Sequence, residues 1–123
     1  MTISIADDEP LARQTLDRML ATLGHRVLSI AEDGQQLIDQ CRQQTPELAI
    51  IDLEMPVLDG LAAAEELRSI SPVPIILLSG HPDINRVVKQ EEPIEVYLHK
   101  PITLRTLEAA IKAAVHSMDD PEV

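Results

Sequence analysis

Short apolar runs alternate along this chain with longer stretches in which apolar residues recur every three or four positions. The apolar runs lie at about 2–6, 26–31, 47–51, 75–78 and 95–98. The periodic stretches begin near residues 10, 34 and 60 and then cover about 83–90 and 103–118. Short apolar runs are typical of buried strands, and the longer period is that of an amphipathic helix. Their alternation predicts a parallel α/β sheet with helices on both faces and right-handed crossovers.

Residues that start or stop helices flank these periodic stretches. Pro10 suits the first turn of a helix, and Gly24 suits the position just after one. Asp33-Gly34 and Asp59-Gly60 are expected to turn the chain into the second and third helices. The side chains predicted to face the sheet from the five helices are Leu16, Met19, Leu20 and Leu23; Leu37, Ile38 and Cys41; Leu61, Ala64 and Leu67; Ile84, Val87 and Val88; and Leu104, Leu107, Ile111, Ala114, Val115 and Met118.

The last strand differs from the other four. Glu95, Tyr97 and His99 would point to one side of it, which predicts a partly exposed edge strand. Tyr97 is also the only aromatic residue among 123, so the core must be aliphatic.

Composition narrows the class of protein. A formal net charge of −11 repels nucleic-acid backbones, so we expect no direct binding to DNA or RNA. The single cysteine, Cys41, excludes an internal disulfide, in keeping with a reducing cytoplasm. No run is long and apolar enough to span a bilayer. We therefore expect a soluble, cytoplasmic domain over residues 1–118, followed by an acidic tail over 119–123.

Charged or hydroxyl side chains stand at the ends of four apolar runs. Asp7 and Asp8 follow the first run, Asp52 the third, Ser79 the fourth, and Lys100 the fifth. Because parallel strands end at one edge of the sheet, where ligands bind, we expect these side chains to share a crevice. Carboxylates are hard oxygen ligands suited to Mg²⁺, and an ammonium group suits phosphate. The set predicts a site for a divalent cation and a phosphoryl group.

Each of these residues also has a simpler interpretation. Asp7 or Asp8 could cap the helix that follows them. Ser79 could bond a local backbone group, and Lys100 could lie in solvent. Asp52 could belong to a surface turn. Directly after a buried strand, however, an unpaired charge is costly, so Asp52 needs a cation or a hydrogen-bonding partner.

Together and in this order, these residues give the chain a resemblance to the receiver domains of two-component response regulators. The matching segments are IADDEP at 5–10, IIDLEMPVLDG at 50–60, LLSG at 77–80 and YLHKP at 97–101. The most specific piece is the pattern DxxMPxxDG from Asp52 to Gly60. The resemblance covers essentially the whole chain. It implies a single flavodoxin-like, doubly wound (βα)5 domain with strand order 2-1-3-4-5.

The resemblance also implies the chemistry of the site. Asp52 would accept a phosphoryl group from a phosphohistidine of a histidine kinase. Asp8 and Asp52 would bind Mg²⁺ directly, with the backbone carbonyl of Glu54, while Asp7 would hold the ion partly through water. Lys100 would pair with Asp52 at rest and with the phosphoryl oxygens afterwards. The product is an acyl phosphate, so the chain would be a phosphoacceptor signalling domain and not an enzyme with turnover.

A switch and two kinds of partner follow from the same resemblance. Ser79 would hydrogen-bond the phosphoryl group, and Tyr97 would turn inward, changing the face formed by 83–90, 95–98 and 103–118. An output protein or domain would dock on that face. A histidine kinase or a histidine phosphotransfer protein would supply the phosphoryl group. The alternative for Tyr97 is an edge-strand ring with a solvated hydroxyl.

Two other classes of protein stay open. A phosphatase of the haloacid dehalogenase type would carry a second aspartate where this chain has Glu54, and would need a cap for which this chain has no room. A docking module of the same fold that is never phosphorylated is disfavoured by the complete set of acids, hydroxyl and lysine.

The segment 91–94 departs from the small residues that receivers often have before the fifth strand. A cis Lys100-Pro101 bond is also implied.

Overall fold

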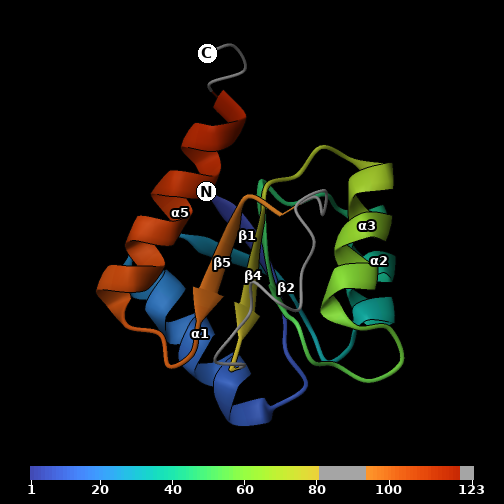
Figure 1. Cartoon of the computed structure of the whole chain (residues 1–123), viewed down its shortest axis with the longest axis horizontal. Coiled ribbons are helices and arrows are strands. Elements are labelled where there is room, and N and C mark those ends of the chain that lie inside the picture. Colours follow the sequence, from blue (N-terminus) through green and yellow to red (C-terminus); the bar gives the residue numbers. More distant parts are fainter. Residues whose placement is uncertain (81–93, 120–123) are drawn as a thin grey trace.

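The computed structural model describes residues 1–80 and 94–119 and shows a parallel sheet between two layers of helices (Figure 1). The strands are ordered β2-β1-β3-β4-β5, and each neighbouring pair is parallel. Fold class and strand order are therefore confirmed. The predicted helix at 83–90 lies outside the described residues. The elements are β1 (Thr2–Ala6), α1 (Pro10–Thr22), β2 (Arg26–Ala31), α2 (Gly34–Gln43), β3 (Leu48–Asp52), α3 (Gly60–Ile70), β4 (Ile75–Ser79), β5 (Val96–His99) and α5 (Leu104–Asp119).

Two aliphatic cores lie on the two faces of the sheet, as period-2 burial of the central strands requires. On β3, Leu48 and Ile50 pack with α1 and α5, whereas Ala49 and Ile51 pack with α2 and α3. Figure 1 shows the same division, with α1 and α5 on one side and α2 and α3 on the other. Many of the helix side chains predicted to face the sheet are buried: Leu16, Leu20, Leu37, Ile38, Cys41, Ala64, Leu67, Leu107, Ile111 and Ala114.

The predicted helix starts are confirmed by their hydrogen bonds. The Asp33 side chain accepts from the backbone N–H of Gln36 at 2.8 Å, and that of Asp59 accepts from Ala62 at 2.9 Å. Such caps satisfy N–H groups that have no partner within the helix. Gly24 follows α1 with φ of 89°, a left-handed conformation that glycine adopts readily.

Three details of the fold correct the sequence analysis. Asp52 and Ser79 are the last residues of β3 and β4 rather than the first residues after them, because the ladder continues to a bond from Leu53 N to Leu78 O at 2.8 Å. Leu104, predicted to face the sheet, is 42% exposed. The apolar side of α5 becomes buried only about one turn later, at Leu107. Helix α5 includes Asp119, the first residue of the predicted tail.

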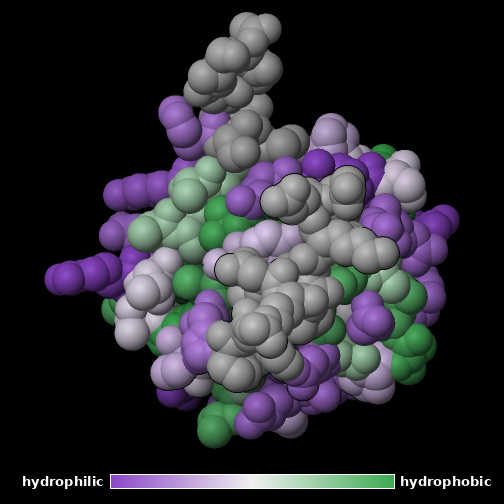
Figure 2. Space-filling view, viewed as in Figure 1, coloured by the Kyte–Doolittle hydropathy of each residue, from purple (hydrophilic) through white to green (hydrophobic). Residues whose placement is uncertain are grey.

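The β5 strand is a half-buried edge strand, as predicted, but Glu95 just before it does not face solvent. Its carboxylate oxygens lie 2.6 and 2.7 Å from Nη2 of Arg68 at the end of α3. Long hydrophilic side chains project from the outer side of α5, at the left of Figure 2. Within the parts of the chain that the structure describes, no helix has the length and apolarity to cross a membrane.

Candidate functional site

Four charged side chains from three strand ends meet at the carboxyl edge of the sheet. Lys100 Nζ lies 3.2 Å from Asp7 Oδ2 and 3.3 Å from Asp52 Oδ1. Carboxylate oxygens of Asp7, Asp8 and Asp52 lie within 4.8 Å of one another. The structure therefore brings together the acids and the ammonium group that the strand-end pattern placed in one crevice. Carboxylate oxygens at such spacing can converge on one hard cation.

Two of the three acids are buried, and the site carries excess negative charge. Asp7 is 1% and Asp52 5% exposed, while Asp8 is exposed. Burial raises the pKa of Asp52 to about 6, and the neighbouring Asp7 carboxylate acts in the same direction, against the opposing effect of Lys100. Burial works against the charge on Lys100, but Asp52 and Asp7 outweigh it and raise the pKa of the ammonium group. A bound cation would offset the repulsion between the carboxylates.

The loop after β1 is held by Asp7 and does not use either aspartate as a helix cap. The backbone N–H of Asp7 donates to Ala31 O at 3.1 Å, and its Oδ1 accepts from Glu9 N at 3.0 Å. The cap residue of α1 is Glu9, which makes no side-chain capping bond. Glu9, and neither aspartate, is therefore the cap residue of α1, although Asp7 accepts the backbone N–H just before Pro10, as the simpler interpretation expected.

The end of β3 is pressed against the start of α3. A Cβ added to Gly60 would clash with the backbone oxygen of Asp52, and Gly60 N donates to Leu53 O at 2.9 Å. Glycine is required here by close approach, a role that the interpretation of Asp59-Gly60 as a turn did not include. Met55 in this loop is buried in the core on the side of α2 and α3. These contacts hold the segment that carries Asp52.

The remaining predicted residues lie around the same edge. Ser79 is fully buried at the end of β4, and its carbonyl accepts from Lys100 N at 2.8 Å. Tyr97 is half-buried against the core on the side of α2 and α3. Glu54 is exposed in a hollow that Asp8 also lines. The Lys100-Pro101 bond is cis, as the resemblance implies.

A cleft of about 440 Å³ opens beside the acids, between α1 and the segment after β5. Asp7 and Lys100 line one part of it. Apolar side chains line the rest, among them Leu11, Ala12 and Ile102. Leu11 is 66% exposed, although it lies at the first turn of α1. A large group could therefore reach Lys100 along an apolar wall.

Sequence reasoning missed one basic residue of this region. Arg13 Nη1 donates to the carbonyl of Asp7 at 2.8 Å, and Nη2 lies 3.4 Å from Glu32 Oε1. A usable signal was present, because Arg13 is the first basic residue after the aspartate pair and lies one helical turn beyond Pro10.

The family model of the response regulator receiver domain matches residues 3–112. This chain belongs to that family. It is 36% identical over 118 residues to the probable transcriptional regulator ycf27 of Porphyridium aerugineum, covering 95% of this chain and 49% of that protein. It is 34% identical over 114 residues to the transcriptional regulatory protein PdtaR of Mycobacterium tuberculosis, covering 92% of this chain and 56% of that protein. The chain thus spans about half the length of these curated relatives.

Solved structures agree with the family assignment. A response regulator receiver domain protein from Clostridium thermocellum superposes with a TM-score of 0.85 at 28% identity, over 96% of each chain. The chain is thus a receiver domain of two-component response regulators, a class of signalling domain rather than of catalytic enzyme. Receiver domains bind Mg²⁺ at an acidic pocket and interact with histidine kinases and output domains. The aspartate cluster described above is a group that could hold such an ion.

Proposed function

We propose that this receiver domain is switched by Mg²⁺-dependent transfer of a phosphoryl group from a phosphohistidine to Asp52. The observation that carries the proposal is the contact of Lys100 with both Asp7 and Asp52, with Asp8 beside them. Asp8, Asp52 and the backbone carbonyl of Glu54 would hold the ion directly, and Asp7 partly through water. The bound Mg²⁺ would offset negative charge on the transferring phosphoryl group.

In the transfer, a carboxylate oxygen of Asp52 attacks phosphorus while the P–N bond of the phosphohistidine breaks. An acyl phosphate forms, and the histidine ring nitrogen keeps the electron pair of the broken bond. Because a carboxylate attacks in its ionised form, the step needs no general base. Lys100 stays beside the new phosphoryl oxygens, and Ser79 offers them a hydroxyl. The apolar cleft beside Lys100 is where the donor protein would approach.

The signal would leave through the edge of the sheet on which Ser79 and Tyr97 lie. Ser79 pairs in register with His99, and Tyr97 precedes that pair by two positions on β5. Movement of the Ser79 hydroxyl toward the phosphoryl group would therefore reach the ring of Tyr97 through neighbouring strands. A histidine kinase or phosphotransfer protein would act as donor in the cytoplasm, and the surface that includes β5 and α5 would contact the output partner. Residues 1–118 would act as one domain.

The test is a phosphorylation assay in which the chain is treated with phosphoramidate and Mg²⁺ and then weighed by mass spectrometry. We expect one phosphoryl group per wild-type chain and none in Asp52→Asn or without Mg²⁺. Asp59→Asn is the matched control, because it makes the same chemical change seven residues away and asparagine can still cap α3. Asp59→Asn should be phosphorylated like the wild type.

Other results would identify the rival functions. Continuous release of phosphate from a small phosphate ester would indicate a phosphatase of the haloacid dehalogenase type. A wild-type chain that gains no phosphoryl group in the presence of Mg²⁺ would indicate a docking module.

A further inference from the structure

The peptide that joins Asp7 to Asp8 is held through its carbonyl by Arg13. Arg13 Nη1 donates to Asp7 O at 2.8 Å, while the Asp7 side chain is held by Glu9 N and Lys100 Nζ. The Asp8 side chain is exposed and has no hydrogen-bond partner among the described residues. Only its backbone therefore sets the direction in which its Cα–Cβ bond leaves the chain. Because a peptide is planar, a bond to the Asp7 carbonyl also fixes how the chain enters Asp8.

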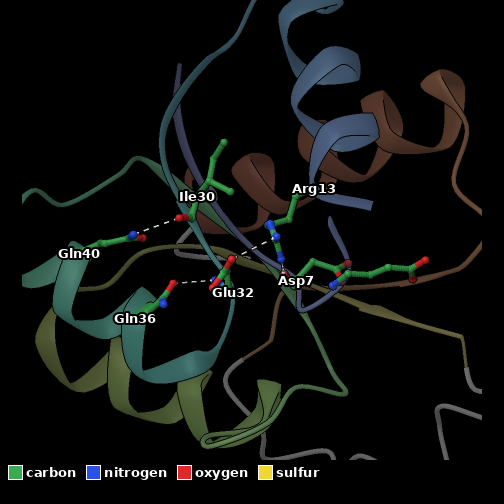
Figure 3. A network of polar contacts seen from close by, with 7 residues as sticks. Asp7, Arg13, Ile30, Glu32, Gln36 and Gln40 are labelled. Carbon is green, nitrogen blue, oxygen red and sulfur yellow. Dashed lines mark hydrogen bonds and ion pairs between the residues drawn. The ribbon is translucent and has the colours of Figure 1, made fainter. Parts of the chain in front are cut away.

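Arg13 is itself held in place on its other side. Its Nη2 lies 3.4 Å from Glu32 Oε1, just after β2, and its side chain is 16% exposed. The backbone N–H of Glu32 donates to Gln36 Oε1 at 2.9 Å, and Gln40 Nε2 donates to Ile30 O at 3.0 Å. Figure 3 shows these contacts running from α2, across the outer edge of β2, to Arg13 and Asp7. The guanidinium group thus joins the acidic loop to β2 and α2.

From these contacts we infer that Arg13 is a positioning residue, which orients the Asp7–Asp8 peptide so that the Asp8 carboxylate faces the divalent cation. The inference rests on the proposed function, since it concerns the same ion. Arg13 touches neither the ion nor the phosphoryl group in this scheme. It acts through the backbone carbonyl of Asp7, supported by Glu32.

Electrostatics alone predicts the opposite effect on metal binding. Arg13 is a cation beside three carboxylates, so removing its charge should strengthen the attraction for Mg²⁺. Positioning instead predicts weaker binding, because the Asp8 ligand loses its fixed direction. Loss of a group that orients a metal ligand weakens affinity about tenfold or more. The sign of the change therefore separates the two explanations.

The experiment is calorimetric titration of the whole chain with MgCl₂ in the wild type and in Arg13→Ala, Arg13→Lys and Arg18→Ala. Arg18 is the matched control, because it is an exposed arginine on the same helix. We expect Kd for Mg²⁺ to rise about tenfold in Arg13→Ala. It should rise less in Arg13→Lys, which keeps the charge but lacks the two separate Nη donors that contact Asp7 O and Glu32. Arg18→Ala should bind like the wild type.

Phosphorylation supplies a second readout that a general loss of structure would not reproduce. In Arg13→Ala the Mg²⁺ concentration that gives half the maximal rate with phosphoramidate should rise by the same factor as Kd. The rate at saturating Mg²⁺ should return close to that of the wild type. A partly unfolded variant would instead show a lower rate at every Mg²⁺ concentration.

Two milder variants test the same role if Arg13→Ala does not fold. Glu32→Gln removes the ion pair with Arg13, and Asp33→Asn removes the same charge one residue later while keeping a cap for α2. Kd should rise more in Glu32→Gln than in Asp33→Asn, and equal values would overturn the inference.

The outcomes separate this inference from the function on which it rests. Unchanged or tighter Mg²⁺ binding by folded Arg13→Ala overturns the role of Arg13 and leaves the proposed function standing. A wild type that binds no Mg²⁺, or an Asp8→Asn variant that binds it as tightly as the wild type, overturns the metal site itself and with it this role.

Discussion

Two groups of charged side chains lie at opposite ends of the sheet, and they are built differently. At the amino end of β4, both carboxylate oxygens of Glu95 lie within 2.7 Å of Arg68 Nη2, and Oε1 also accepts from Ile75 N at 2.7 Å. At the carboxyl edge, Asp7 and Asp52 share the ammonium of Lys100 at 3.2 and 3.3 Å, with Asp8 beside them. The first group is a close ion pair. The second has more acid than base.

This difference separates a structural ion pair from a site that can bind a cation. Close contact and a backbone donor offset the desolvation of Glu95, so the pair can hold α3 to the start of β4 and β5. The acids around Lys100 repel one another in a buried place, and burial raises the pKa of Asp52 to about 6. The raised pKa indicates that ionised Asp52 is unfavourable in this fold, and a bound metal cation would offset that cost. Mutations in the two groups should therefore have opposite effects on stability.

The largest effect is expected at the close ion pair. Glu95→Ala leaves the Arg68 guanidinium and Ile75 N–H without this acceptor, so it should lower the free energy of unfolding by about 3 kcal/mol. Urea denaturation followed by circular dichroism measures the change. Glu65→Ala on the exposed side of α3 is the control and should stay within about 0.5 kcal/mol of the wild type. A loss below about 1 kcal/mol in Glu95→Ala would contradict a structural role.

The acidic group should respond in the opposite direction. Asp52→Asn removes a buried negative charge that Asp7 and Asp8 repel, so without Mg²⁺ it should raise the free energy of unfolding by about 2 kcal/mol at pH 7.5. The same denaturation experiment measures it. Destabilisation by Asp52→Asn would show that Lys100 balances the cluster after all.

The pH dependence of the stabilisation expected for Asp52→Asn follows from the pKa of Asp52, which is raised from 3.8 to about 6. Below both values the carboxyl is protonated in folded and unfolded chains. It then carries no charge that could destabilise either state. Between them the folded state binds more protons, so the stability of the wild type falls as pH rises. The advantage of Asp52→Asn should thus be absent near pH 3.8, grow up to about pH 6 and then level off. A gain that is independent of pH would exclude this cause.

Mg²⁺ should produce a smaller change that distinguishes the two groups. A ligand that binds only the folded state at ten times its Kd stabilises by about 1.4 kcal/mol. Thermal unfolding of the wild type should therefore move up by a few degrees with Mg²⁺ and return after chelation with EDTA. Glu95→Gln should keep this response and Asp52→Asn should lose most of it. Equal responses in both variants would place the ion elsewhere.

The smallest expected effect concerns the loop that follows Asp52. Val57 is 81% exposed and has φ of 69°, a conformation unfavourable for a β-branched residue. Val57→Gly should raise the free energy of unfolding by about 1 kcal/mol. Val57→Ala retains a Cβ and should recover less than half of that gain. An equal gain in both variants would mean that backbone strain is not the cause.

Much of the site could be predicted because its residues stand at strand ends. Asp7, Asp8, Asp52 and Lys100 each follow or end an apolar run, and parallel strands with helical connections bring such ends to one edge. The contacts of Arg68 with Glu95 and of Arg13 with Glu32 could not be predicted in this way. They join residues 27 and 19 positions apart whose meeting depends on how helices lie on the sheet.

The sequence by itself determined the fold class, the strand order through its family resemblance, and which residues gather at the carboxyl edge. Hydrophobic periodicity is local, so it is readable without coordinates. Only the tertiary structure decided that Asp8 stays exposed while Asp7 and Asp52 are buried, that Gly60 presses against the Asp52 carbonyl, and that Arg13 holds the acidic loop. Burial, close approach and hydrogen bonding depend on the packing of distant elements, and no local pattern encodes them.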